Sequence, residues 1–98
     1  MAESKIKRII RFLKLCLKES EVKVSNIILF GSHAKGLASK GSDIDIVIVS
    51  DDFKGKDLFE RARLTKEAEI KTMKKFLVPL DILTMTVKEW YKSKSMLI

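Results

Sequence analysis

The chain has 98 residues, and 20 Lys and Arg against 13 Asp and Glu leave it with a net charge of +7. The length predicts one small domain over residues 1–98, and a hydrophobic share of 46% predicts a folded core. The composition excludes a membrane-spanning apolar run and an apolar signal peptide, and the single cysteine excludes an internal disulfide or a Cys-rich zinc site. We therefore expect a cytoplasmic protein that binds anionic partners and no membrane.

The first third of the chain predicts a helix followed by a strand. Between residues 3 and 19, apolar side chains recur at helical spacing; they are Ile6, Ile9, Ile10, Leu13, Cys16 and Leu17. Because Cys16 lies on this stripe, we expect it to be a core residue and not a nucleophile. Residues 24–30 are largely apolar and predict a strand that ends at Gly31, with a short helix beginning near Ser32.

The middle of the chain predicts a second strand and a long helix. Residues 43–50 are β-branched and largely apolar, which favours a well-buried strand, and residues 40–42 before it form a loop. Asp57 is expected to cap a helix that runs to about Lys75. The apolar residues expected to pack this helix on the core are Leu58, Ala62, Ile70 and Met73.

The last third predicts a third strand and a short helix. Residues 77–84 form the strand, in which Pro79 favours an edge position or a bulge. Thr86 and Glu89 have the spacing of a capping box, which indicates a short final helix. Helices thus alternate with strands, and we expect an α/β (α+β) fold: a small mixed sheet of three or more strands flanked by helices, in the order α-β-α-β-α-β-(α).

Two carboxylates, Asp43 and Asp45, stand two residues apart in the second predicted strand, so their side chains project from the same face. Like charges this close in an apolar strand are costly without a cation between them. Mg²⁺ prefers such oxygen ligands together with substrate phosphates. An alternative stays open, in which Asp43 caps the loop and Asp45 is an exposed edge residue.

The turn after the first predicted strand has the features of a phosphate site. Gly31 lets the backbone approach a ligand closely, and a helix that begins near Ser32 turns free N–H groups toward an anion. The Ser32 hydroxyl adds a donor, and Lys35, one helical turn on, adds a cation. The alternative is an ordinary strand-to-helix turn with Ser32 as its N-cap, which leaves the neighbouring acids without an explanation.

A third acid, Asp81, is flanked by apolar residues in the third predicted strand. An acid in such a segment is costly unless it is paired or bound to a metal. If the third strand lies beside the second, Asp81 completes a triad with Asp43 and Asp45 of the kind that two-metal catalysis needs. A structural ion pair between Asp81 and a Lys or Arg is the alternative.

These residues together resemble a known family. Gly31-Ser32, ten intervening residues, Asp43-Ile44-Asp45 and the later strand acid Asp81 resemble the DNA polymerase beta-like nucleotidyltransferase superfamily. The Gly-Ser-x-Ala-basic-Gly run from Gly31 to Gly36 and the short length resemble the minimal nucleotidyltransferases (MNT) of archaea and bacteria within it.

The resemblance implies roles for these residues. The nucleotide-binding set comprises Gly31, Ser32, Lys35 and Ser42, of which Ser42 also fits a turn cap. The catalytic and metal-binding set comprises Asp43, Asp45 and Asp81. The implied reaction moves a nucleoside monophosphate, AMP from ATP or the equivalent from another nucleoside triphosphate, to a hydroxyl, with two Mg²⁺ ions as cofactors and pyrophosphate as the leaving product.

The resemblance also implies a partner. Many minimal nucleotidyltransferases are similar to antitoxins that pair with a HEPN-domain ribonuclease toxin, and some add AMP to that toxin. Two other functions stay open: a non-catalytic module that neutralises its partner by complex formation, and a small-molecule nucleotidyltransferase that forms its acceptor pocket as a homo-oligomer. Nucleic acid is not expected as a direct substrate. The apolar tail Met96–Ile98 is a candidate partner contact.

Overall fold

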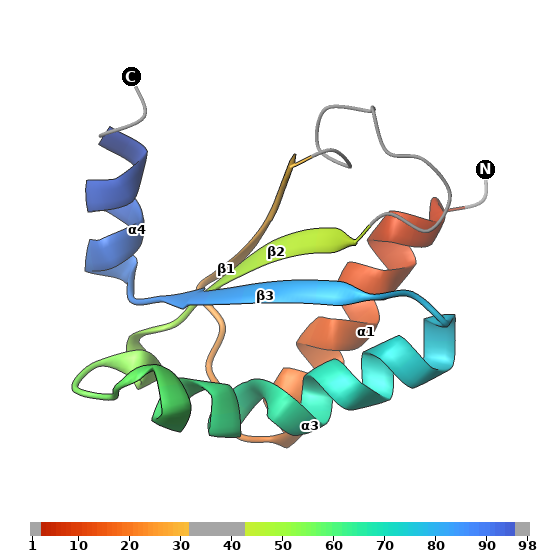
Figure 1. The fold of residues 1–98 in the computed structure, drawn as a ribbon, viewed down its shortest axis with the longest axis horizontal. Coiled ribbons are helices and arrows are strands. Elements are labelled where there is room, and N and C mark those ends of the chain that lie inside the picture. Colours follow the sequence, from red (N-terminus) through yellow and green to blue (C-terminus); the bar gives the residue numbers. More distant parts are fainter. Residues whose placement is uncertain (1–2, 32–42, 96–98) are drawn as a thin grey trace.

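The computed structural model describes residues 3–31 and 43–95 (Figure 1). Its elements in chain order are α1 (Lys5–Glu19), β1 (Asn26–Phe30), β2 (Ile44–Val49), the 3-10 helix η1 (Asp51–Phe53), α3 (Leu58–Phe76), β3 (Leu80–Met85) and α4 (Val87–Ser95). The expected mixed α+β class is confirmed. The short helix expected near Ser32 falls outside the described residues. None of the described helices combines the length and the apolar character needed to cross a membrane.

The three strands form one mixed sheet in the order β1-β2-β3. β1 pairs with β2 antiparallel, and β2 pairs with β3 parallel. β3 is therefore an edge strand, as Pro79 predicted. The strand begins at Leu80, three residues later than expected, because α3 continues to Phe76 and closes through Leu77, which adopts a left-handed backbone (φ 54°) and donates its N–H to the Met73 carbonyl at 2.8 Å.

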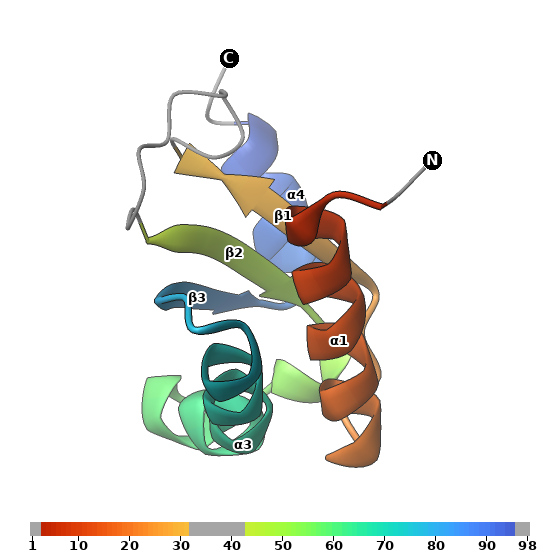
Figure 2. The same ribbon diagram turned by 90° about the vertical axis from the view of Figure 1, so that its right-hand side faces the viewer.

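Helices α1 and α3 cover one face of the sheet, whereas α4 stands at the far end of β3 (Figures 1 and 2). The apolar stripe predicted for α1 is confirmed, with Ile9, Leu13 and Leu17 fully buried and Cys16 beside them in the core. On the sheet, every second residue of β2 faces these helices; they are Ile44, Ile46 and Ile48. The alternate residues of β2 face the opposite side, because side chains alternate along a strand.

The inner face predicted for α3 is confirmed at Met73, which packs partly buried against the core, and is wrong at the other three residues, of which Ala62 is exposed. Leu58 is 75% exposed and Ile70 is 37% exposed, and the residues of this helix that are buried are Arg61, Thr65, Ala68 and Thr72. The two threonines can be buried because each hydroxyl donates to a backbone carbonyl of its own helix, as Thr72 does to Ala68 at 2.7 Å. Leu64, Met73 and Phe76 complete this face as partly buried apolar residues, and the polar side chains between them hide the apolar periodicity from a sequence pattern.

Both predicted caps are confirmed. The Asp57 carboxylate accepts the Glu60 N–H at 2.9 Å while the Glu60 carboxylate accepts the Asp57 N–H at 3.2 Å, so α3 begins with a capping box. Before α4, the Thr86 N–H donates to Glu89 at 2.8 Å and the Glu89 N–H donates to the Thr86 hydroxyl at 3.1 Å. Reciprocal bonds of this kind satisfy the free N–H groups of a first helical turn.

Candidate active site

Asp45 and Asp81 lie side by side on neighbouring strands. They are register partners in the parallel pairing of β2 with β3, so both side chains project from the same face of the sheet. This face is opposite to the one covered by α1 and α3, since Ile44 and Ile46 on either side of Asp45 belong to the core. Adjacent strands are about 4.8 Å apart. The pairing therefore brings two carboxylates from residues distant in the sequence within reach of one small ligand.

Asp43 lies at the entrance to the same strand. β2 begins at Ile44, one residue later than predicted, and the Ile44 N–H donates to the Pro79 carbonyl at 3.0 Å. Asp43 is exposed. Within residues 3–31 and 43–95, no three His, Cys, Asp or Glu side chains are grouped so that they could hold a metal ion. The backbone thus places Asp43, Asp45 and Asp81 at one end of the sheet, but their three side chains are not grouped closely enough there to hold a metal ion together.

Gly31 directly adjoins the Asp45 carboxylate. It follows the last residue of β1, Phe30, which is the register partner of Asp45. Gly31 has φ +73°, and a Cβ atom at this position would overlap a carboxylate oxygen of Asp45. A residue with a side chain is therefore disfavoured here for two separate reasons, a left-handed backbone and a lack of space. Gly31, which the sequence assigns to phosphate binding, thus lies beside an acid assigned to metal binding.

Asp81 is exposed, so it does not need the ion pair or metal that was expected of an acid among apolar neighbours. The apolar neighbours of Asp81 suggested a buried acid that needed a partner, but those neighbours alternate between the two faces of an edge strand and leave Asp81 facing solvent. The alternative of a structural ion pair is not supported either, because Asp81 makes no salt bridge with any residue in the described ranges.

The remaining predicted site residues fall outside the part of the chain that the structure describes. They are Ser32, Lys35 and Ser42. The tail Met96–Ile98, a candidate partner contact, also lies outside it. Their roles therefore stay predictions.

Sequence reasoning missed a fourth carboxylate on which the charge of Asp81 acts. Glu69 of α3 is half-buried, and burial raises its pKa above the ordinary value, with the negative charge of Asp81 as a second cause. Glu69 lies on α3, which covers the face of the sheet opposite to the one from which Asp81 projects, so the Asp81 charge acts on Glu69 at a distance and Glu69 is not part of the Asp45–Asp81 pair. No local pattern around Glu69 signals its burial, because burial depends on how the helix is rotated about its axis.

The donor set suits a hard divalent cation. Carboxylate oxygens are the protein ligands that Mg²⁺ prefers, and Mg²⁺ commonly uses one or two of them together with waters and substrate phosphates. Asp45 and Asp81 supply such a pair on adjacent strands, and Gly31, which has no side chain, adjoins the Asp45 carboxylate. The residues that are described therefore fit a magnesium–nucleotide complex.

Comparison with known proteins identifies the family. Residues 5–98 match the family model of the nucleotidyltransferase domain. A Methanocaldococcus jannaschii protein provisionally named a protein adenylyltransferase is 47% identical over 49 residues, a stretch that covers 50% of this chain and 48% of that relative. The matched stretch thus spans about half the length of the relative.

Two solved structures share the fold. A protein from Sulfolobus solfataricus provisionally described as a nucleotidyltransferase has a TM-score of 0.54 and 25% identity, over 94% of this chain and 84% of that chain. BolA1 from Arabidopsis thaliana has a TM-score of 0.59 over 90% of this chain and 98% of that chain, and at 22% identity this likeness concerns the fold alone. The family match covers nearly the whole chain and includes the acids and the glycine turn; the chain belongs to the nucleotidyltransferase domain family.

Proposed function

We propose that this protein transfers a nucleoside monophosphate, AMP from ATP, to a hydroxyl of a partner protein. Asp43, Asp45 and Asp81 would hold Mg²⁺, and Gly31 with Ser32, Lys35 and Ser42 would hold the triphosphate. The observation that carries the proposal is the register pairing of Asp45 with Asp81 directly beside the Gly31 turn. The similarity to the Methanocaldococcus jannaschii relative supports a protein as the acceptor.

In the proposed reaction the acceptor oxygen attacks the α-phosphorus of ATP. A bond from that oxygen to phosphorus forms, the bond from phosphorus to the bridging oxygen of pyrophosphate breaks, and the hydroxyl proton leaves to the Asp81 carboxylate or to water. Bound Mg²⁺ would supply neutralisation of the phosphate charge. Asp45 and Asp81 position the reacting groups, because both project from the same face at one end of the sheet, where Asp81 is exposed to an approaching acceptor.

We further propose that the partner is a HEPN-domain ribonuclease toxin, for which this protein is the antitoxin. The support is the resemblance of the Gly31–Gly36 run and the acid triad to minimal nucleotidyltransferases. Modification of a partner would silence the toxin covalently. A gene beside this one that encodes a small helical protein with an Arg-x₄-His pattern would identify the toxin.

The test is transfer of label from α-labelled ATP, with Mg²⁺, to a protein in lysate of the source cell. We expect one labelled band with the wild type and a loss of at least about a hundredfold in Asp45→Asn and Asp81→Asn, since these carboxylates neutralise charge in the transition state. Glu67→Gln is the matched control, because it removes one negative charge from an exposed position on α3. Transfer by Asp45→Asn at the wild-type rate would refute the mechanism.

A second function is a binding module that neutralises its partner without catalysis. It is favoured by the finding that, within the described residues, no three potential ligands form a metal-holding group. This function predicts that a partner co-purifies equally with the wild type and with Asp43→Asn, in the presence or absence of Mg²⁺ and ATP, and that no label is transferred.

A further inference from the structure

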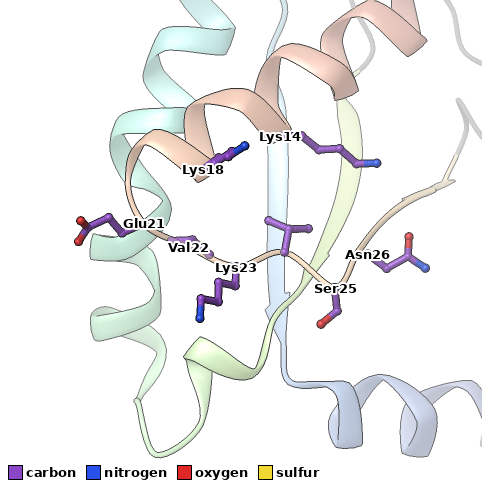
Figure 3. Close-up of a pocket in the computed structure, with 8 residues that line it drawn as sticks. Lys14, Lys18, Glu21, Val22, Lys23, Ser25 and Asn26 are labelled. Atoms are coloured by element: carbon purple, nitrogen blue, oxygen red, sulfur yellow. The ribbon is translucent and has the colours of Figure 1, made fainter.

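A groove of about 720 Å³ lies between α1 and the segment that leads into β1 (Figure 3). Lys14 and Lys18 line it from α1, and Val22, Lys23 and Val24 line it from the segment. We call this hollow the α1–β1 groove. It lies at the start of β1, whereas the candidate active site follows the end of that five-residue strand, roughly 13 Å further along. The groove is therefore separate from the site of the proposed reaction.

Hydrogen bonds hold in place the side of the groove formed by residues 21–25, the segment between α1 and β1. The Lys23 N–H donates to the Asp52 carboxylate at 2.7 Å, and the Lys23 carbonyl accepts from the Ser50 hydroxyl at 2.6 Å. Two residues on, the Ser25 N–H donates to the Val49 carbonyl at 2.8 Å. A surface fixed in this way loses little conformational entropy when it is covered, which favours binding.

The groove combines free positive charge with an apolar floor. Lys14, Lys18 and Lys23 are exposed, and none of them makes a salt bridge with a residue in the described ranges. Glu21, the acid among the lining residues, points its carboxylate away from Lys14 and Lys18 (Figure 3). Val22 forms part of the floor and is 3% exposed. A complementary ligand thus carries both carboxylates and aliphatic groups.

We propose that the α1–β1 groove docks an acidic, amphipathic segment of a partner protein. Aliphatic side chains of that segment fill the floor beside Val22 and Val24, and its carboxylates pair with Lys14, Lys18 and Lys23. The docking goes beyond the proposed reaction, because it needs neither nucleotide nor metal.

Two other occupants fit the groove less well. A second copy of this chain would bring three lysines against another basic surface, since the chain carries a net charge of +7. Single-stranded nucleic acid binds through bases stacked on aromatic side chains, and none of the described side chains that line the groove is aromatic. The rings of Phe12 and Phe76 lie in a neighbouring hollow that shares Lys14 and Lys18 with the groove, and there Lys75 already covers Phe12 at 5.1 Å and Arg8 covers Phe76 at 5.8 Å.

The test measures binding of a fluorescent synthetic peptide in which Glu alternates with Leu, by fluorescence anisotropy, without nucleotide or Mg²⁺. We expect saturable binding that weakens as salt is added. Lys14→Gln with Lys18→Gln should weaken it about tenfold, and Lys14→Glu with Lys18→Glu should weaken it further, because each removed or reversed charge loses an ion pair. Arg63→Glu with Lys66→Glu makes the same change of charge on exposed residues of α3 and should retain binding.

Circular dichroism establishes that each variant is folded before its binding is compared. Asp45→Asn should bind the peptide as the wild type does, which separates docking from the proposed reaction. The proposal is wrong if the acidic peptide does not bind, or if the α3 control weakens binding as much as the groove variants do. It is also wrong if oligothymidylate binds more tightly than the peptide, or if the groove variants abolish a dimer seen by sedimentation instead.

Discussion

Gly31 shows how one missing side chain shapes the candidate site. Its absent Cβ leaves space that the Asp45 carboxylate occupies, and its φ of +73° is a backbone conformation that other residues adopt only at a cost. Gly55 has a similar φ of +70° but has no atom within 4 Å of the place where a Cβ would stand. The two glycines therefore separate the cost of backbone strain from the cost of displacing Asp45.

We predict that Gly31→Ala and Gly55→Ala each lose about 1–2 kcal/mol of unfolding free energy from backbone strain. Gly31→Ala should lose about 1–3 kcal/mol more, because the added methyl group displaces Asp45. It should also lose about a hundredfold in nucleotide transfer, whereas Gly55→Ala should retain activity. Thermal unfolding and the label-transfer assay measure both effects. Equal loss of activity in the two variants would show that the Asp45 contact has no role.

Glu69 gives a second prediction at the scale of one residue. Its pKa lies above the ordinary value, first because of burial and then because of Asp81, so its contribution to stability is present at low pH and is lost as the pH rises through the folded pKa. Glu69→Gln should therefore raise the unfolding free energy at neutral pH, by less than about 1 kcal/mol, and leave it unchanged well below about pH 4.

NMR titration of the Glu69 carboxyl carbon checks this prediction. Asp81→Asn should lower the measured Glu69 pKa part of the way toward its ordinary value, since burial is the larger cause and remains. A Glu69 pKa at or below about 4.3 in the wild type would contradict the prediction.

Among the elements, α4 is attached to the rest of the fold through Arg61 of α3. The Arg61 side chain is buried and donates to Glu89 of α4 at 2.7 and 3.3 Å, to the Lys56 carbonyl at 2.9 Å and to the Thr84 carbonyl at 3.4 Å. Its guanidinium also lies 5.9 Å from the ring centroid of Phe53, a core residue. One arginine thus joins two helices, the end of β3 and η1.

We predict that Glu89→Gln lowers the unfolding free energy by about 1–2 kcal/mol at neutral pH, because it leaves the buried Arg61 without a charged partner. This loss is smaller than that expected for a fully buried ion pair, since the Glu89 side chain is 49% exposed. Gln retains the capping geometry with Thr86, so the change isolates the charge. The hydrogen bond from Arg61, followed by the one from the Thr86 backbone, lowers the pKa of Glu89.

The pH dependence of this effect has a definite sign. A lowered folded pKa means that the contribution of Glu89 is present above its unfolded pKa of about 4.3 and is lost as the pH falls through the folded pKa. The difference in unfolding free energy between wild type and Glu89→Gln should therefore vanish in acid.

The control variant is Glu67→Gln, which removes an exposed ion pair with Lys71 at 3.2 Å and should cost no more than about 0.5 kcal/mol of unfolding free energy. Equal costs in the two variants would refute a special role for Arg61.

At the scale of the whole molecule, one continuous core joins α1, α3 and the sheet. We predict that residues 1–98 unfold in a single transition, with calorimetric and van't Hoff enthalpies that agree at about 60–80 kcal/mol, as is typical for a domain of this length. Ile46→Ala, in the fully buried centre of β2, should cost about 2–5 kcal/mol and shift that transition as a whole. A second transition in the calorimetric trace would contradict a single domain.

Local patterns in the sequence were sufficient for much of the fold. The α1 stripe, the Asp57 cap, the Thr86–Glu89 capping box and the edge position after Pro79 were all predicted, because each depends on residues within a few positions of one another. Apart from Met73, the inner face of α3 was not, because it depends in part on polar side chains that form their hydrogen bonds within the helix. The Arg61 contacts were not predicted either, since they join residues up to 28 positions apart.

For the candidate site, the sequence by itself determined which residue types are present and in what order, three acids and a glycine turn, and residues 5–98 match the nucleotidyltransferase domain family. Only the tertiary structure decided that Asp45 is the register partner of Asp81, that the Asp45 carboxylate occupies the space of the missing Gly31 side chain, and that Glu69 is half-buried on α3. The physical reason is that residue types and short spacings are local properties of a chain, whereas strand register and helix rotation are set by the packing of the whole core.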